Sequence, residues 1–138
     1  LRDATRLSAE DDRPAAAPGV ALAHLYLKTG RAGLALAEAQ RASLLEPSAS
    51  ALTLVGAARI ELGQLEQADQ DLRAALKLSP DDTRARGELG RLQALRGKYA
   101  LAAESFKAVI ERDPSNVNAR TNLERLAPLL DATRAPTP

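Results

Sequence analysis

Apolar residues along this chain follow a helical spacing that glycine and proline interrupt at regular intervals. Between Gly63 and Pro80, apolar side chains fall mostly three or four positions apart, as they do on one face of an amphipathic helix. A glycine just past a helix ends it readily, and the residue before a proline disfavours helical dihedral angles. The pattern therefore predicts short helices that are separated by tight turns.

This arrangement occurs three times in register. Pro47, Pro80 and Pro114 are spaced by 33 (80 − 47) and 34 (114 − 80) positions. A glycine precedes each of these prolines by 17 (114 − 97) positions. Self-similarity at this period indicates a stacked array in which no repeat can bury its apolar face alone. We therefore predict an all-α fold, an α-solenoid of antiparallel helix pairs.

The repeat register sets the expected domain organisation. We predict one domain over residues 16–127, made of three repeats and a capping helix, at about 16–47, 48–80, 81–114 and 117–127. An unpaired last helix would cover the open apolar end of the stack. Residues 1–15 do not fit the repeat and are interpreted as a linker or non-repeat segment. Residues 128–138 are expected to be a Pro-rich disordered tail, because Pro128 should stop the capping helix.

Small residues recur where the two helices of a pair should meet. Gly56 and Gly90 occupy equivalent positions in the first helices, and Ala68 and Ala102 occupy equivalent positions in the second. We expect Gly56 to face Ala68 and Gly90 to face Ala102, so that the two backbones approach closely. A larger side chain at such a contact would cost about 1–3 kcal/mol by overpacking.

Composition narrows the class of protein further. Aromatic residues make up 2% of the chain, and there is no cysteine, which excludes disulfides and thiolate metal sites. The formal net charge of +1 gives no general attraction to nucleic acid or acidic lipid. No run of 18 apolar residues exists, so we expect no direct membrane insertion. The chain starts at Leu1 and holds no methionine, which suggests a processed product or an excised fragment.

The three repeats resemble the tetratricopeptide repeat family, a helix–turn–helix pattern of 34 residues. The second repeat carries the resemblance most fully, through Leu52, Val55, Gly56, Gly63, Leu65, Ala68, Leu72, Ala75, Leu76 and Pro80. The third matches at Leu89, Gly90, Gly97, Tyr99, Ala102, Phe106 and Pro114, and the first at Leu22, Ala23, Tyr26, Gly30, Ala35, Ala42 and Pro47. The family's usual tryptophan is replaced by Gly19, Leu52 and Arg86, which suggests looser packing.

The resemblance implies a right-handed superhelix whose concave groove holds a peptide or a partner helix. Carrying the groove positions over residue by residue gives a candidate site of ten residues: His24, Lys28, Thr53, Ala57, Arg84, Gly87, Arg91, Asn118, Asn122 and Arg125. The same register places nine further side chains along the groove: Ala17, Val20, Leu27, Ser50, Ile60, Glu61, Ala94, Leu95 and Thr121.

The C-terminal half of this groove is predicted to be basic and rich in amides. Arg84, Gly87 and Arg91 share one helix face, which favours a partner with an acidic side chain or a C-terminal carboxylate. The alternative is a solvated face with local ion pairs of Glu88 to both arginines, worth about 0.2–0.5 kcal/mol each. The chaperone-tail-binding subgroup of the family uses a lysine and two asparagines where Val20, His24 and Ala57 stand here, which argues against that ligand.

Nothing in the sequence predicts catalysis. His24 is the only histidine and lacks partners for a metal site, and no nucleophile–base set or phosphate-binding glycine loop is present. We therefore predict no enzyme activity, no catalytic residue, no metal and no cofactor. Tyr26, Tyr99 and Phe106 fall at repeat-core positions, so a base-stacking surface for nucleic acid is not expected.

The function expected from the sequence is a non-catalytic protein–protein interaction module, acting as an adaptor or assembly scaffold. Two alternatives stay open: a self-associating scaffold, and the targeting domain of a larger enzyme. The bias towards alanine, leucine and arginine looks bacterial, and bacterial proteins of this type often serve in envelope, pilus or secretion assembly. The periplasm is therefore slightly favoured over the cytoplasm as the compartment.

Overall fold

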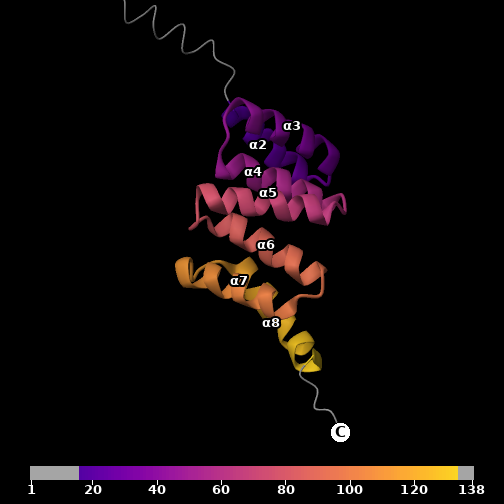
Figure 1. Ribbon diagram of the computed structural model, residues 1–138, viewed down its shortest axis with the longest axis vertical. Helices are drawn as coiled ribbons and strands as arrows, with labels where there is room; N and C mark the ends of the chain where they lie inside the picture. Colours follow the sequence, from indigo (N-terminus) through magenta and orange to yellow (C-terminus); the bar gives the residue numbers. More distant parts are fainter. Residues whose placement is uncertain (1–15, 134–138) are drawn as a thin grey trace, which may run out of the picture.

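The computed structural model describes residues 16–133, and all the regular structure in that range is α-helical. Residues 16–133 form seven helices, which are stacked along one axis (Figure 1). In chain order they are α2 (Ala16–Lys28), α3 (Ala32–Leu45), α4 (Ala49–Glu61), α5 (Leu65–Leu78), α6 (Thr83–Leu95), α7 (Tyr99–Arg112) and α8 (Val117–Thr133). The predicted linker at 1–15 and the last five residues of the predicted tail lie outside this range.

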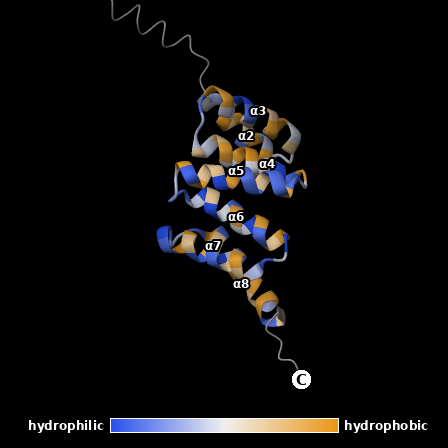
Figure 2. Ribbon diagram, viewed as in Figure 1, coloured by the Kyte–Doolittle hydropathy of each residue, from blue (hydrophilic) through white to orange (hydrophobic). Residues whose placement is uncertain are grey.

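The helices form consecutive pairs that stack on one another. The most extensive contacts join α2 to α3, α4 to α5 and α6 to α7, and each pair also contacts the next one along the chain. The predicted α-solenoid of helix pairs is therefore confirmed. Each helix carries both hydrophobic and hydrophilic residues (Figure 2), as expected where one side meets neighbouring helices and the other meets solvent.

Each pair is joined by the same kind of turn. Gly30, Gly63 and Gly97 have φ angles of 76°, 78° and 76°, in the left-handed region that favours glycine. At the second turn, the backbone N–H of Gly63 donates to the carbonyl of Ile60 and that of Gln64 donates to the carbonyl of Arg59. These bonds satisfy the last carbonyl groups of the helix and reverse the chain direction.

Helices α4, α6 and α8 each follow a residue whose side chain caps the start of the helix. The Ser48 hydroxyl accepts a hydrogen bond from Ala51 N at 3.1 Å, and Asp82 Oδ1 accepts one from Ala85 N at 3.0 Å. Asn116 Oδ1 does the same for Ala119 N at 2.9 Å. Each cap satisfies one of the backbone N–H groups left unpaired at a helix start. Ser48 is therefore the N-cap residue of α4.

The close approach of paired helices is confirmed, but the expected partners were partly wrong. A Cβ atom added at Gly56 would lie 2.8 Å from Cγ of Leu72, with the Ala68 carbonyl oxygen at 3.5 Å. At Gly90 it would lie 2.9 Å from Cε1 of Phe106. The glycines are therefore needed because a large buried side chain of the second helix lies over them.

The capping helix is longer than predicted. Pro128 lies inside α8, which continues to Thr133, so the expectation that the helix stops at Pro128 and that a disordered tail begins there was wrong. An interior proline removes one backbone hydrogen bond and costs about 3 kcal/mol. Leu130, beyond the proline, packs against the same apolar cluster of α7 and α8 as Leu123. This packing offsets the cost of the proline.

Candidate functional site

One face of the stack holds a groove of about 720 Å³, lined mainly by α2, α4, α6 and α8. These are the first helices of the three pairs and the capping helix. The second helix of the last pair contributes to the floor through Phe106 and Val109, which are both buried. The groove therefore crosses every repeat, and residues from both ends of the described chain meet in it.

The structure brings together all the predicted site residues except Thr53. The groove is lined by His24, Lys28, Ala57, Arg84, Gly87, Arg91, Asn118, Asn122 and Arg125. Thr53 is fully buried, and it lines a second, smaller hollow instead. This second hollow shares His24 and Arg84 with the main groove, so Thr53 lies beside the main groove and not in it.

The additional groove positions divide among several environments. Leu27, Glu61 and Thr121 line the main groove, whereas Val20 and Ser50 line the smaller hollow. Ile60, Ala94 and Leu95 line neither: Ile60 is a core residue, Ala94 packs against the α7–α8 cluster, and Leu95 is exposed. The surroundings of the Ala17 side chain lie outside the described part of the chain.

Six groove residues were not predicted: Thr83, Glu88, Phe106, Val109, Asn116 and Ala119. Glu88 and Asn116 matter most for the chemistry. Glu88 lies four positions after Arg84 and three before Arg91, and this helical spacing was the signal in the sequence that could have predicted it. Asn116 precedes the last helix and is an N-cap residue type, but its cap position removes its side-chain oxygen from ligand binding.

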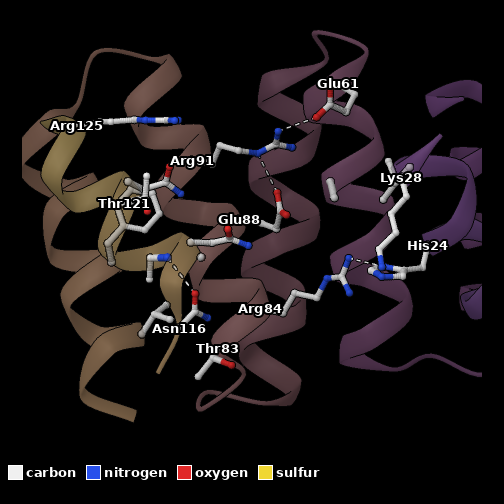
Figure 3. Close-up of a pocket in the computed structure, with 18 residues that line it drawn as sticks. His24, Lys28, Glu61, Thr83, Arg84, Glu88, Arg91, Asn116, Thr121 and Arg125 are labelled. Carbon is white, nitrogen blue, oxygen red and sulfur yellow. Dashed lines mark hydrogen bonds and ion pairs between the residues drawn. The ribbon is translucent and has the colours of Figure 1, made fainter. Parts of the chain in front are cut away.

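Arg91 is held by two carboxylates. Its Nε donates to Glu88 at 3.1 Å and its Nη1 donates to Glu61 at 2.6 Å (Figure 3). Although burial disfavours its charged form, Glu88 and then Glu61 raise the pKa of Arg91 above its usual value. The predicted local ion pair of Glu88 with Arg91 is therefore present, and the charge of Arg91 is already balanced within the protein.

Arg84 has a different partner. Its Nη2 lies 2.7 Å from Nδ1 of His24, sixty positions away in the sequence, and the contact spans from α6 to α2 (Figure 3). No ion pair joins Arg84 to Glu88 among the described residues, so that half of the predicted ion-pair pattern was wrong. Because an arginine can only donate, Nδ1 of His24 is the acceptor and the imidazole is neutral in this arrangement.

The surroundings of His24 favour its neutral form. Partial burial, then the positive charge of Arg84 and then that of Lys28, lower the pKa of His24 below 6.5. The unfolded chain therefore takes up a proton at a higher pH than the folded chain does. The free energy of unfolding should fall as the pH drops from 6.5 through the folded-state pKa of His24.

We expect the substitution Arg84→Gln to raise the pKa of His24, because it removes both a nearby cation and a donor that requires the neutral ring. The measurement is an NMR titration of the imidazole protons, which are easily assigned because the chain has one histidine. Arg96→Gln is the matched control, since Arg96 is exposed and lies outside the groove. Superimposable titration curves for the two variants would contradict the observed contact.

Two other cations line the groove without a carboxylate partner among residues 16–133. They are Lys28 on α2 and Arg125 on α8, and Arg125 extends from α8 towards the side of the groove where Arg91 lies (Figure 3). The groove thus holds four basic side chains and two acidic ones, and the two acidic ones are both used by Arg91. The uncompensated charge is concentrated on Lys28, Arg84 and Arg125.

Within the described range, no group of three or more histidine, cysteine or acidic side chains is placed to hold a metal ion. No helix in that range is long and apolar enough to cross a membrane. What the groove offers chemically is hydrogen-bond donors: guanidinium groups at Arg84 and Arg125, and side-chain amides at Asn118 and Asn122.

Together, the fold and the groove define a helical-repeat solenoid with a groove along one face. A family model described as "Tetratricopeptide repeat" matches residues 56–117. The described part of the chain has the tetratricopeptide repeat fold, with three repeats and a C-terminal capping helix that form a right-handed superhelix.

Solved structures of this fold cover most of the chain. The first TPR domain of human RPAP3 is similar with a TM-score of 0.79 and 20% identity, over 88% of this chain and 97% of that one. The first TPR of Spaghetti (RPAP3), bound to HSP90 peptide SRMEEVD, gives 0.76 and 21%, over 87% and 96%. The Sgt2 TPR domain from Aspergillus fumigatus gives 0.78 and 20%, over 89% and 84%. At these identities the likeness shows the fold alone.

Proposed function

We propose that this chain is a non-catalytic interaction module that binds an acidic segment of a partner protein in its concave groove. The observation that carries the proposal is the pair Arg84 and Arg125. They come from different helices, line one groove and have no carboxylate partner among residues 16–133. A guanidinium group binds a carboxylate through two parallel hydrogen bonds, so each arginine offers a site for one acidic group.

Arg91 has a supporting part in this proposal. Because Glu61 and Glu88 already bind its guanidinium group, a ligand carboxylate at Arg91 would have to compete with two others. The sequence alone favoured Arg84 and Arg91 as the carboxylate-binding pair. The contacts favour Arg84 and Arg125 instead, with Asn118 and Asn122 beside them to pair with the backbone of an extended peptide.

The Spaghetti domain supports the choice of an acidic ligand, since the HSP90 peptide bound to it reads SRMEEVD. We do not propose that this chain binds the HSP90 peptide. The matching residues Val20, His24 and Ala57 lack the side chains with which the chaperone-tail-binding subgroup is expected to hold the tail. We propose an acidic segment of another partner, and the groove leaves open whether a side chain or a C-terminal carboxylate supplies the charge.

The experiment is a selection from two random peptide libraries, one with free and one with amidated C-termini. We expect enrichment of Asp and Glu among the retained peptides, and weaker binding of those peptides as the salt concentration rises. Acidic enrichment with amidated ends assigns the charge to side chains, and enrichment only with free ends assigns it to the C-terminal carboxylate. A selection without acidic enrichment in either library would overturn the proposed function.

The setting we propose is the one that the composition favours, in which the chain acts as an adaptor or scaffold in bacterial envelope, pilus or secretion assembly. Cross-linking in the source cells, followed by identification of the bound protein, tests that setting. Self-association is a second candidate, favoured by three leucines that α3 leaves exposed, Leu34, Leu44 and Leu45. A sedimentation mass that stays monomeric as the protein concentration rises would exclude self-association.

A further inference from the structure

A second hollow of about 510 Å³ lies beside the main groove. It is bounded by α2, the turn between α3 and α4, the first half of α4 and the start of α6. His24 and Arg84 line both hollows, so the contact between these two side chains lies where one hollow meets the other. A segment bound along the concave face would pass from the groove into this second pocket at Arg84.

The second pocket differs from the groove in chemistry. Val20, Ala21 and Leu54 give it an apolar wall, whereas half of the residues that line the groove carry charged or amide side chains. Its acidic side chains are Glu46 and Asp82, and neither forms an ion pair with another described residue. The sign of the unbalanced charge thus reverses from the groove, where it is positive, to the second pocket, where it is negative.

Thr53 adds an independent sign that this pocket accepts a ligand. Its side chain lines the pocket, and its hydroxyl oxygen is buried without a hydrogen-bond partner among the described residues. A buried hydroxyl without a partner lowers stability, and most such groups in proteins are paired. A polar backbone group of a peptide in the pocket would supply the missing partner.

We infer that the partner segment is extended and carries an acidic residue, an apolar residue two positions away from it, and a basic residue beyond the apolar one. The inference rests on the proposed function, because the acidic residue is the one bound at Arg84. The apolar side chain occupies the second pocket against Ala21 and Leu54, and the basic residue lies opposite Glu46. Side chains at positions i and i+2 of an extended chain lie on the same face, about 7 Å apart, which suits two adjoining pockets.

The test repeats the amidated-library selection with wild type, with Ala21→Leu and with Ala74→Leu. Ala21 and Ala74 are both exposed helical alanines, so each variant should keep the fold, but only residue 21 lies in the second pocket. We expect wild type and Ala74→Leu to select an apolar residue at a fixed spacing of two positions from the acidic one. Ala21→Leu should still select the acidic residue but lose the apolar preference, because its side chain fills the pocket.

The affinity of one selected peptide then measures how much its apolar residue contributes to binding. Replacing its apolar residue by serine should weaken binding to wild type about tenfold, equivalent to about 1.4 kcal/mol, and leave binding to Ala21→Leu unchanged. Acidic enrichment without a fixed apolar position, or acidic enrichment only with free C-termini, would overturn this inference and keep the proposed function. Apolar enrichment without acidic residues, or no enrichment, would overturn both.

Discussion

Replacing Phe106 by alanine should lower the free energy of unfolding by about 3–5 kcal/mol, the usual cost for a buried aromatic side chain. Phe106 is 2% exposed and packs over Gly90 of the preceding helix. Domains of this size are stable by about 5–15 kcal/mol, so the loss could leave much of the chain unfolded. Urea denaturation followed by circular dichroism measures it. Leu101→Ala, at an exposed residue of the same helix, should change stability by less than about 0.5 kcal/mol.

A double-mutant cycle tests whether the contact between the Phe106 ring and Gly90 explains why position 90 requires a glycine. In the wild-type background, Gly90→Ala places a Cβ atom 2.9 Å from the ring, and overpacking of about 1–3 kcal/mol outweighs the gain of about 0.5–1 kcal/mol from replacing a helical glycine. In the Phe106→Ala background only the Cβ atom of Ser105, at 3.1 Å, opposes the gain from replacing the helical glycine, so Gly90→Ala should be close to neutral. Equal effects in both backgrounds would mean that Phe106 does not explain the glycine at position 90.

Reversing the charge of both Arg84 and Arg125 to glutamate should weaken binding of an acidic peptide at least a hundredfold. Each substitution removes a charge-assisted hydrogen bond and places a carboxylate beside the ligand's own. The assay is fluorescence anisotropy with an acidic peptide selected by wild type. Circular dichroism should show an unchanged fold, since Arg125 is exposed and His24 is the one hydrogen-bond partner of the Arg84 side chain among residues 16–133.

The matched control is the double substitution Arg96→Glu with Arg120→Glu. Both residues are exposed, and neither lines the groove or forms an ion pair among residues 16–133. The control changes the net charge of the chain equally, so it isolates the location of the charge from its amount. We expect it to weaken binding only slightly, through long-range electrostatics. Equal losses in the two double variants would reject a site at Arg84 and Arg125.

Most of the fold could be predicted from the sequence because its signals are local and repeated. Gly63 ends α4, and Ser48 and Asp82 begin helices, through bonds to residues at most five positions away. The repeat register also placed Arg84 and Arg125 in one groove, since equivalent positions of stacked helices face the same side. Local rules failed at Pro128, where packing of Leu130 against the preceding helix prevails over the helix-breaking tendency of proline.

The electrostatic character of the groove could not be predicted from local signals in the sequence. A pair at a spacing of three, such as Glu88 with Arg91, can be anticipated from the sequence, and it is present. The contacts of Arg91 with Glu61 and of Arg84 with His24 join residues thirty and sixty positions apart. They depend on the rotation and separation of stacked helices, which the packing of whole side chains sets and which no local pattern encodes.

The sequence by itself thus determined the repeat, the helices and turns, and the set of side chains that face the groove, because backbone preferences and the repeat period act over short distances. Only the tertiary structure decided which of those side chains stay available to a ligand. It buried Thr53, engaged Arg91 with two carboxylates and left Arg84 bonded to a neutral imidazole. Availability depends on which groups meet across helices, and a shift of a few ångströms makes or breaks a hydrogen bond.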